Sequence, residues 1–411
     1  MEMSQAAAGG GATRGAGGIF AMALLFAALI SEGFDLQMAS FAAPAVATEF
    51  GTTRAAMGPF LSASLVGVLL GAVAVAPLGD RFGRRRLIVG GCLAYGILSL
   101  AGAFATSLGQ LTLLRFVIGL GLGGVLPNAL ALAGDLARPG RTAMAGAMIG
   151  IGITFGGVVA GLASAALIPA YGWRGVFVTG GVLPLAIAAL LAAFLPESPV
   201  LPGRARDRRI GLGELLRHGR AGMTLPIWLV FACVLMTVYL LTGWIPLLLT
   251  QEGFSVREAA LVATLFQGGG VVGGVVASLA LHRHGWRVVA FFAAGAALVL
   301  MALAAFAAGT LLLSIGVFAV GFFVTGMQNA INGAGGASYP PRLRASGLGW
   351  ALGIGRLGSI AGPLVGGLAA TFGMTTARDL FLLPLLPVAL AAAAALWLAT
   401  RIAFDDNREN M

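Results

Sequence analysis

The sequence contains no lysine, so all 25 of its basic residues are arginines, and only 10% of its 411 residues are charged. Soluble domains carry about a quarter charged residues, so this composition excludes an ordinary soluble protein. The chain also has only three histidines and two cysteines, Cys92 and Cys233, and both cysteines lie in apolar runs. These residues provide neither a disulfide framework nor the ligand cluster of a zinc site. We therefore expect no metal and no cofactor.

Hydrophobic residues make up 59% of the chain, and the mean hydropathy is +0.96. Runs of about 20 apolar residues are long enough to cross a bilayer as helices. The sequence therefore predicts an all-α polytopic membrane protein with twelve transmembrane helices. The predicted spans are residues 18–41, 56–78, 87–106, 109–134, 142–168, 174–195, 226–249, 258–281, 287–308, 311–335, 345–371 and 379–400.

One long polar connection divides these spans into two sets of six. The predicted order is a disordered N-terminus at 1–17, a six-helix bundle at 18–195, a central loop at 196–225, a second bundle at 226–400 and a tail at 401–411. The halves also resemble each other in sequence: residues 80–83 after the second span correspond to residues 282–285 after the eighth. Two pseudo-symmetric bundles in the same orientation are typical of a transporter.

The arginines predict the orientation of the chain. With the N-terminus inside, 19 arginines fall in cytoplasmic segments and four in outer loops. Positive residues accumulate on the cytoplasmic side of membrane proteins, so both termini are expected in the cytoplasm. The net charge of +10 then reflects orientation in the lipid bilayer, and no nucleic acid partner is expected. We expect a monomer in the cell inner membrane whose first span is retained as an uncleaved helix.

Four charged residues lie inside the predicted spans, away from the span ends: Glu32, Asp35, Arg115 and Arg356. A charge in hydrocarbon is costly and usually marks a functional site, often for protons or cations. Glu32 and Asp35 share one helix face and lie at a depth similar to that of Arg115. A structural ion pair explains Arg115 as well as a ligand site does. Arg356 has no acidic partner in its own half, which favours a bound anion, the alternative being a packing role.

Two other chemistries can be set aside. The glycine-rich stretch 115–128 resembles a nucleotide-binding loop, but such a loop must follow a strand in a βαβ unit. Glycines in a spanning helix instead allow neighbouring backbones to approach closely. A membrane hydrolase needs a cluster of His, Asp and Ser or of His and Cys at one depth, and the spans contain none. We therefore expect no enzyme activity.

The segment 78–86 (LGDRFGRRR) follows the second span and resembles the loop signature of the major facilitator superfamily. The family consensus opens with glycine where this chain has Ala76, a change between small residues. The resemblance implies two six-helix bundles that alternate in access. It also implies that this loop takes part in gating on the cytoplasmic side. The gating residues expected from it are Asp80, Gly83, Arg84, Asp135 and Arg141.

Three further segments resemble the aromatic acid:proton symporter family: 32–35 (EGFD) in helix 1, 115–128 in helix 4, and Gly355-Arg356 in helix 11. The likeness extends to residues 238–246 and 251–254 around helix 7. The family usually has aspartate where this chain has Glu32, a change that keeps the carboxyl group. Within the family, the amino-acid sequence of helix 1 is most similar to that of the hydroxyphenylpropionate transporters.

This resemblance implies a secondary transporter that imports an aromatic carboxylic acid, hydroxyphenylpropionate- or hydroxybenzoate-like, by proton symport. Asp35 and Glu32 would carry protons, and Arg356 would hold the substrate carboxylate. The expected substrate-binding residues lie in helices that resemble the superfamily's cavity helices: Arg356, Arg115, Gln37, Asn128, Tyr239, Trp244, Gln328, Asn329 and Asn332. The alternatives are a proton symporter for a non-aromatic acid and a drug:proton efflux antiporter. The antiporter is disfavoured because helix 5 lacks its usual proline.

Overall fold

The computed structural model describes residues 13–136, 142–198, 212–217, 220–306, 309–340, 342–374 and 376–409. This part of the chain consists of helices and their connections and contains no β-strand. The helices are α2 (Thr13–Glu49), α3 (Arg54–Ala74), α4 (Leu78–Phe82), α5 (Arg84–Gly102), α6 (Leu108–Leu136), α7 (Thr142–Phe194), α8 (Leu212–Leu216), α9 (Ala221–Gln251), α10 (Val256–His284), α11 (Trp286–Phe306), α12 (Thr310–Ala337), α13 (Arg344–Thr371), α14 (Ala377–Leu382) and α15 (Leu385–Glu409).

Eleven stretches of the described chain are long and apolar enough to cross a membrane, which confirms the predicted all-α polytopic class. The predicted spans 142–168 and 174–195 both lie in α7, which is 53 residues long. Gly172 interrupts the helical backbone between them with φ 66° and ψ −176°. A residue with a Cβ rarely adopts this conformation, so the glycine permits the chain to change direction there. The last predicted span is divided into α14 and α15.

Several helices extend beyond the predicted domain boundaries. Helix α2 begins at Thr13, inside the N-terminus expected to be disordered, and residues 1–12 lie outside the described residues. Helix α8 and the start of α9 occupy part of the predicted central loop, and α15 continues to Glu409 in the predicted tail. An apolar run marks the part of a helix that hydrocarbon can accept, whereas the helix itself continues until its backbone groups find other partners.

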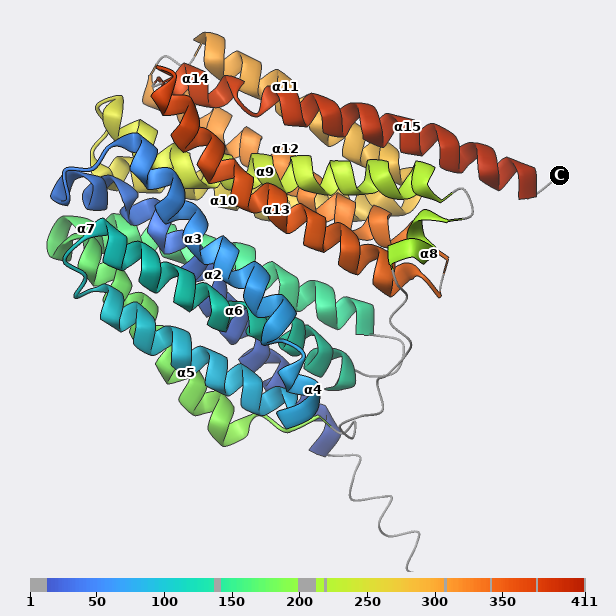
Figure 1. Cartoon of the computed structure of the whole chain (residues 1–411), viewed down its shortest axis with the longest axis horizontal. Helices are drawn as coiled ribbons and strands as arrows, with labels where there is room; N and C mark the ends of the chain where they lie inside the picture. Colours follow the sequence, from blue (N-terminus) through green and yellow to red (C-terminus); the bar gives the residue numbers. More distant parts are fainter. Residues whose placement is uncertain are drawn as a thin grey trace, which may run out of the picture.

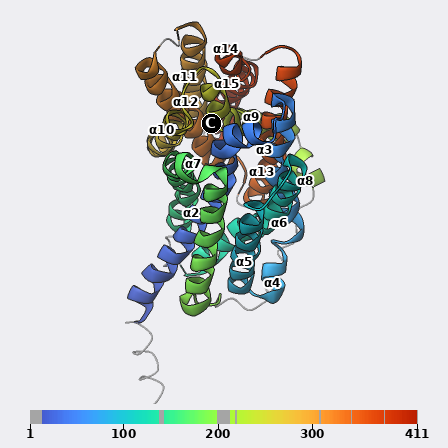
Figure 2. The same ribbon diagram turned by 90° about the vertical axis from the view of Figure 1, so that its left-hand side faces the viewer.

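The helices fall into two groups, α2 to α7 and α9 to α15 (Figures 1 and 2). Helix α3 packs on α13 and α7 packs on α10, and these pairs join the groups. Ser62 of α3 donates a hydrogen bond of 3.0 Å to the carbonyl oxygen of Ile360 in α13. The groups converge toward the end where these contacts lie and diverge toward α4 and α8 (Figure 1).

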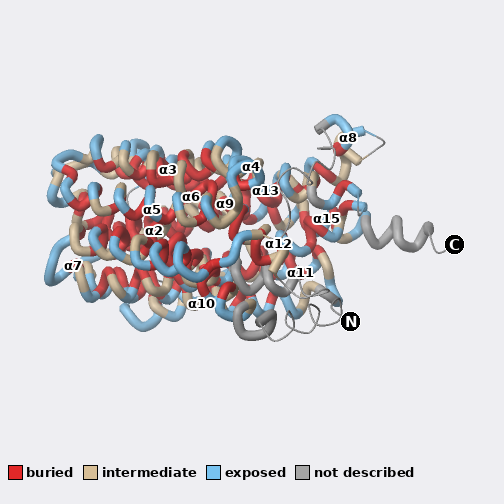
Figure 3. The backbone as a smooth tube through the Cα atoms, turned by 90° about the horizontal axis from the view of Figure 1, so that it is seen from below, coloured by how far each residue is buried: buried red, intermediate tan, exposed pale blue. Residues whose placement is uncertain are grey.

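Buried positions run along the inside of both groups, and exposed positions cover the outside (Figure 3). The exposed positions include large apolar side chains such as Val73, Leu279 and Leu311, each more than 70% exposed. So large an apolar outer surface suits contact with lipid and is unfavourable in water.

Glycines bring α3 and α6 into direct backbone contact. A Cβ placed on Gly119 would lie 2.2 Å from the carbonyl oxygen of Ser64, and one on Gly67 would lie 2.1 Å from that of Phe116. The interpretation of the 115–128 glycines as helix-packing residues is therefore confirmed for Gly119. This close crossing holds Arg115, one turn away in α6, against α3.

Gly119→Ala is expected to destabilise the protein because the added methyl group meets backbone atoms that cannot move aside. Overpacking of this kind costs about 1–3 kcal/mol. Gly121→Ala is the matched control, since a Cβ there finds its nearest neighbour at 3.7 Å. Thermal unfolding in detergent should show a lower melting temperature for Gly119→Ala alone. Equal melting temperatures for the two variants would contradict the tight crossing.

Candidate functional site

Asp35 of α2 and Arg115 of α6 form an ion pair in the interior of the first helix group. Arg115 Nη1 donates to Asp35 Oδ1 at 2.7 Å and to the backbone oxygen of Asp35 at 2.9 Å. The two side chains are 1% exposed or less. The sequence placed these opposite charges at matching depth, and the structure brings them into contact. Each charge compensates part of the other's desolvation cost.

Two serines from other helices complete the surroundings of this pair. Ser99 of α5 donates to Asp35 Oδ2 at 3.1 Å, and Arg115 Nη2 donates to Ser64 Oγ of α3 at 2.9 Å. Arg115 Nε is buried and has no hydrogen-bond partner in the described part of the chain. Four helices thus supply groups to one ionic cluster, which a change in the charge of Asp35 would affect directly.

Glu32 lies one turn before Asp35 on α2 and is 1% exposed. Its Oε2 atom is buried and has no hydrogen-bond partner among the described residues. The nearby charges of Arg356 and Asp35 both act on it electrostatically. A buried, charged carboxylate oxygen without a direct partner is unfavourable, and protonation removes that cost. The cluster therefore contains one carboxyl group held by an arginine and a second without a hydrogen bond at Oε2.

Arg356 of α13 comes from the second helix group and is partly buried. The described chain offers its guanidinium no hydrogen bond or ion pair, whereas its backbone oxygen accepts a hydrogen bond from Ser359 Oγ. The sequence offers Arg356 no acidic partner in its own half, and Glu32, the carboxyl group on which its charge acts, belongs to the other half. Arg356 is thus a cation with available hydrogen-bond donors. Its charge acts on Glu32, which belongs to the other helix group.

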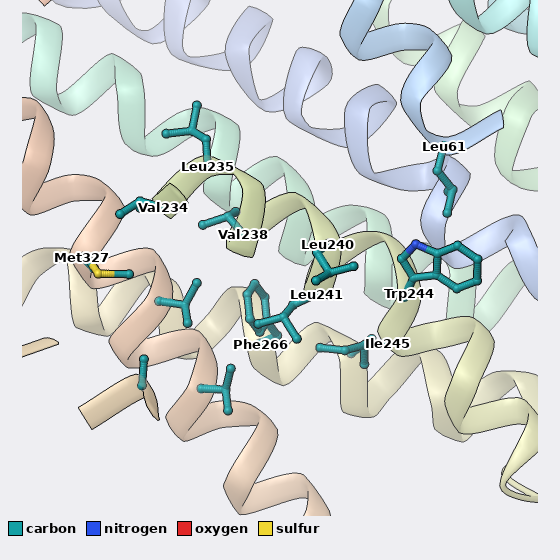
Figure 4. Close-up of a cluster of buried hydrophobic side chains, with 14 of the residues drawn as sticks. Leu61, Val234, Leu235, Val238, Leu240, Leu241, Trp244, Ile245, Phe266 and Met327 are labelled. Atoms are coloured by element: carbon teal, nitrogen blue, oxygen red, sulfur yellow. The ribbon is translucent and has the colours of Figure 1, made fainter. Parts of the chain in front are cut away.

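Two of the expected substrate-binding residues hold helices together. Trp244 of α9 is buried and donates from Nε1 to the carbonyl oxygen of Pro363 at 3.1 Å. Its ring lies in an apolar cluster with Leu61 of the other group nearby (Figure 4). Asn128 of α6 donates from Nδ2 to the carbonyl oxygens of Ala76 and Gly124. Both side chains have their donors occupied in this arrangement, away from the ionic cluster.

The remaining polar residues of the second group are less buried. Tyr239 on α9 and Gln328 and Asn329 on α12 are partly buried, and Asn332 is exposed. Asn329 donates from Nδ2 to the carbonyl oxygen of Thr325, one turn earlier. These side chains belong to the second helix group, whereas the Asp35–Arg115 pair lies in the first.

Gln37 of α2 lies at the junction between the two groups. A Cβ placed on Gly157 of α7 would lie 3.2 Å from Gln37 Cγ and 2.7 Å from Nε2 of Gln267 in α10. The sequence reasoning missed Gln267, which is 4% exposed. The available signal was an amide in the middle of the predicted span 258–281.

Three of the expected gating residues, Asp80, Arg84 and Asp135, meet at the α4–α5 turn. Arg84 forms ion pairs with Asp135 of α6 and, at 3.3 Å, with Asp80. Ser198 also donates a hydrogen bond to Asp135, at 2.5 Å. Asp80 is 60% exposed, so in this arrangement its ion pair is local to the loop. The ion pair joins two of the expected gating residues, Arg84 and Asp135, and Arg141 lies outside the described residues.

Gly83 separates α4 from α5 with φ 100° and lies against Glu197. The sequence reasoning missed Glu197, which accepts a hydrogen bond of 3.0 Å from the backbone nitrogen of Arg85. A carboxylate at the start of a helix is favourable because free N–H groups point toward it. The segment after α7 is therefore fastened to the start of α5 near the gating residues.

The described residues contain no group of three or more His, Cys, Asp or Glu side chains that could hold a metal ion. What the site offers is two carboxyl groups and two arginines in a largely apolar interior. Such groups can exchange protons and bind an anion.

Three curated relatives match most of the chain. A gallate transporter of Pseudomonas putida is 35% identical over 406 residues, covering 91% of this chain and 90% of the relative. The 4-hydroxybenzoate transporter PcaK of the same species is 35% identical over 411 residues, with the same coverage. The 3-(3-hydroxy-phenyl)propionate transporter of Escherichia coli K12 is 34% identical over 357 residues, covering 86% and 87%.

A solved structure with a similar fold is that of a bacterial homologue of the human lysosomal transporter Spinster, in an inward-facing and unoccupied conformation. The TM-score is 0.76, with 20% identity, over 94% of this chain and 98% of the other. The family model described as Major Facilitator Superfamily matches residues 25–363 and, in a second match, 228–410. The fold, the apolar spans and these matches agree, and the chain belongs to the Major Facilitator Superfamily of multi-pass membrane transporters.

Proposed function

We propose that this protein imports an aromatic carboxylic acid together with protons across the cell inner membrane. The observation that carries the proposal is the buried cluster of Asp35, Arg115 and Glu32 near the available guanidinium of Arg356. Asp35 and Glu32 take up protons, and Arg356 binds the substrate carboxylate. The protein functions as a monomer built from two six-helix bundles.

The substrate class is proposed from the relatives and from the chemistry of the site. The relatives are named as transporters of gallate, 4-hydroxybenzoate and 3-(3-hydroxy-phenyl)propionate, all of which are hydroxylated aromatic carboxylic acids. A guanidinium binds a carboxylate through two parallel hydrogen bonds, and aromatic side chains suit a ring. A ligand with one carboxylate and one aromatic ring therefore fits a site with one available arginine in an apolar interior.

Proton coupling follows from competition for Arg115 and Arg356. Burial favours the neutral form of a carboxyl group, whereas a nearby arginine favours the charged form. A proton on Asp35 weakens its hold on Arg115, and a proton on Glu32 removes the charge that attracts Arg356. Both changes make the site more positive, so an anionic substrate binds more tightly. Substrate and protons therefore enter together.

Orientation is proposed from the arginine count, which places both termini and the α4–α5 turn in the cytoplasm. The contacts between α3 and α13 then lie at the outer end. On this assignment the structure corresponds to an inward-facing state, closed to the outside by helix packing. Alternating access requires the same two groups to separate there and to meet on the cytoplasmic side.

Uptake into proteoliposomes tests this function. A pH gradient, acidic outside, should drive saturable accumulation of labelled 4-hydroxybenzoate, and a proton ionophore should abolish it. Non-aromatic acids and cationic drugs serve as competing substrates. Accumulation of a non-aromatic acid alone, or export driven by the same gradient, would exclude the proposal.

Asp35→Asn is expected to lose gradient-driven uptake because the amide cannot cycle between charged and neutral forms. Substrate binding or exchange at equal pH should remain measurable, since Arg356 is intact. Ser99→Ala is the matched control because it removes one hydrogen bond from Asp35 and leaves the carboxyl group. Full proton-driven accumulation by the Asp35→Asn protein would exclude Asp35 as the coupling residue.

Arg356→Ala is expected to abolish measurable uptake, and Arg356→Lys to weaken binding, because lysine keeps the charge but cannot form the paired hydrogen bonds. A hydrogen bond to a charged group contributes about 1.5–3 kcal/mol, so affinity should fall roughly ten- to hundredfold. Arg344→Ala, at the exposed start of the same helix, is the control. Unchanged affinity in a folded Arg356→Ala protein would remove Arg356 from the site.

Asp80→Asn is expected to slow transport while leaving affinity at the outer side nearly unchanged. Asp80 would stabilise the outward-facing state by meeting the positive N-terminal end of α13, a contact absent from the present arrangement. Turnover and external half-saturation are read from initial uptake rates. Wild-type turnover in Asp80→Asn would show that the loop does not act as a latch.

A further inference from the structure

One face of α10 carries polar groups that the roles given above leave unused. Gln267, Gly270 and Gly274 lie on this face at spacings of three and four residues. Thr325 and Asn329 of α12 border its two glycines. At Gln267 the face meets the other helix group, through Gly157 of α7 and Gln37 of α2. The face therefore reaches the junction at which the two groups move relative to each other.

The amide nitrogen of Gln267 is buried and has no hydrogen-bond partner among the described residues. The same is true of the hydroxyl oxygen of Thr325. Both residues are more than 90% buried. The hydroxyls of α10 behave differently: Thr264 donates to the carbonyl oxygen of Ala260, and Ser278 donates to that of Gly274. Leaving a buried donor unpaired is unfavourable, so a partner is expected at some stage of the cycle.

The packing of the neighbouring residue, Phe266, sets the direction in which Gln267 points. Phe266 is 1% exposed and lies in the apolar cluster of the second group, beside Leu241 and Ile245 of α9 (Figure 4). Gln267, the next residue, is turned by about 100° around the helix. Packing of Phe266 therefore fixes Gln267 toward Gly157 and Gln37 of the other group.

We propose that Gln267, with Gln37 beside it, binds the ring hydroxyl of the substrate and thereby sets the preference for hydroxylated aromatic acids. This inference rests on the proposed function. A primary amide offers a donor and an acceptor, which match the phenolic hydroxyl, itself both donor and acceptor. Arg356, which lies near Glu32, would bind the substrate carboxylate. Gln37 lies five residues beyond Glu32 on α2, a rise of about 7.5 Å.

The position between the two groups explains how the hydroxyl would act on transport. In the present arrangement Gly157 occupies the space in front of the Gln267 amide. A ligand that reaches this amide must do so when α7 and α10 have moved apart. A ring hydroxyl would then satisfy donors from both groups at once, and release would return Gln267 to Gly157. The lack of a side chain on Gly157 permits the return.

Gln267→Leu tests the inference because it keeps much of the volume and removes both polar atoms. Dissociation constants of benzoate, 4-hydroxybenzoate and 3-(3-hydroxyphenyl)propionate are measured by calorimetry on the purified full-length protein. Loss of a neutral hydrogen bond should weaken binding of the two hydroxylated acids about three- to tenfold and leave benzoate unchanged. Thr264→Val, one turn earlier on α10 with its hydroxyl already bonded, should change none of the three.

Gly157→Ala provides a second variant that leaves Gln267 in place. The added methyl group meets the flexible end of the glutamine and should displace the amide, so it should lower the same hydroxyl preference. Equal affinity changes for benzoate and the hydroxylated acids, or a preserved preference in both variants, would overturn the inference alone. Failure of the wild-type protein to bind any of the three acids would remove the proposed function as well.

Discussion

The buried ion pair of Asp35 and Arg115 is the interaction on which the first helix group depends. It lies where α2, α3, α5 and α6 come together, and each of these helices supplies a hydrogen-bonding group to it. Removing one partner of such a pair costs about 3–5 kcal/mol because the other charge is left buried. The backbone contact at Gly119 holds α6 close enough to α3 for Arg115 to reach Ser64. Packing and ionic chemistry therefore support each other at this point.

The second pair of charges is arranged differently. Glu32 and Arg356 belong to different helix groups and influence each other without a direct bond. A charge pair inside one rigid group keeps its geometry when the groups move, whereas a pair shared between groups does not. The Asp35–Arg115 pair therefore keeps its surroundings within the first group while the two groups move. The interaction between Glu32 and Arg356 changes when the two groups move relative to each other or when an anion binds Arg356.

The sequence predicted the parts that depend on composition and on rare residues. Charges are so scarce in the spans that Glu32, Asp35, Arg115 and Arg356 could be found by elimination, and the loop motif identified Arg84 with Asp135. It could not reveal that the charge of Arg356 acts on Glu32, because the two residues are more than 300 positions apart in the chain. Gln267 was missed because the sequence does not show that its amide faces Gly157 of the other helix group. Trp244 and Asn128 looked like ligand contacts since a sequence does not show that backbone carbonyls occupy their donors.

The Asp35–Arg115 pair also bears on the energy source. Arginine stays protonated in proteins, so only the carboxyl partner changes charge. If one proton accompanies each monocarboxylate, the loaded carrier and the empty carrier have the same net charge. One complete cycle then carries no net charge across the membrane, so the membrane voltage does no net work on it. Accumulation would follow the difference in pH across the membrane, so such a carrier would work equally well in a cell that has lost its voltage but kept an acidic exterior.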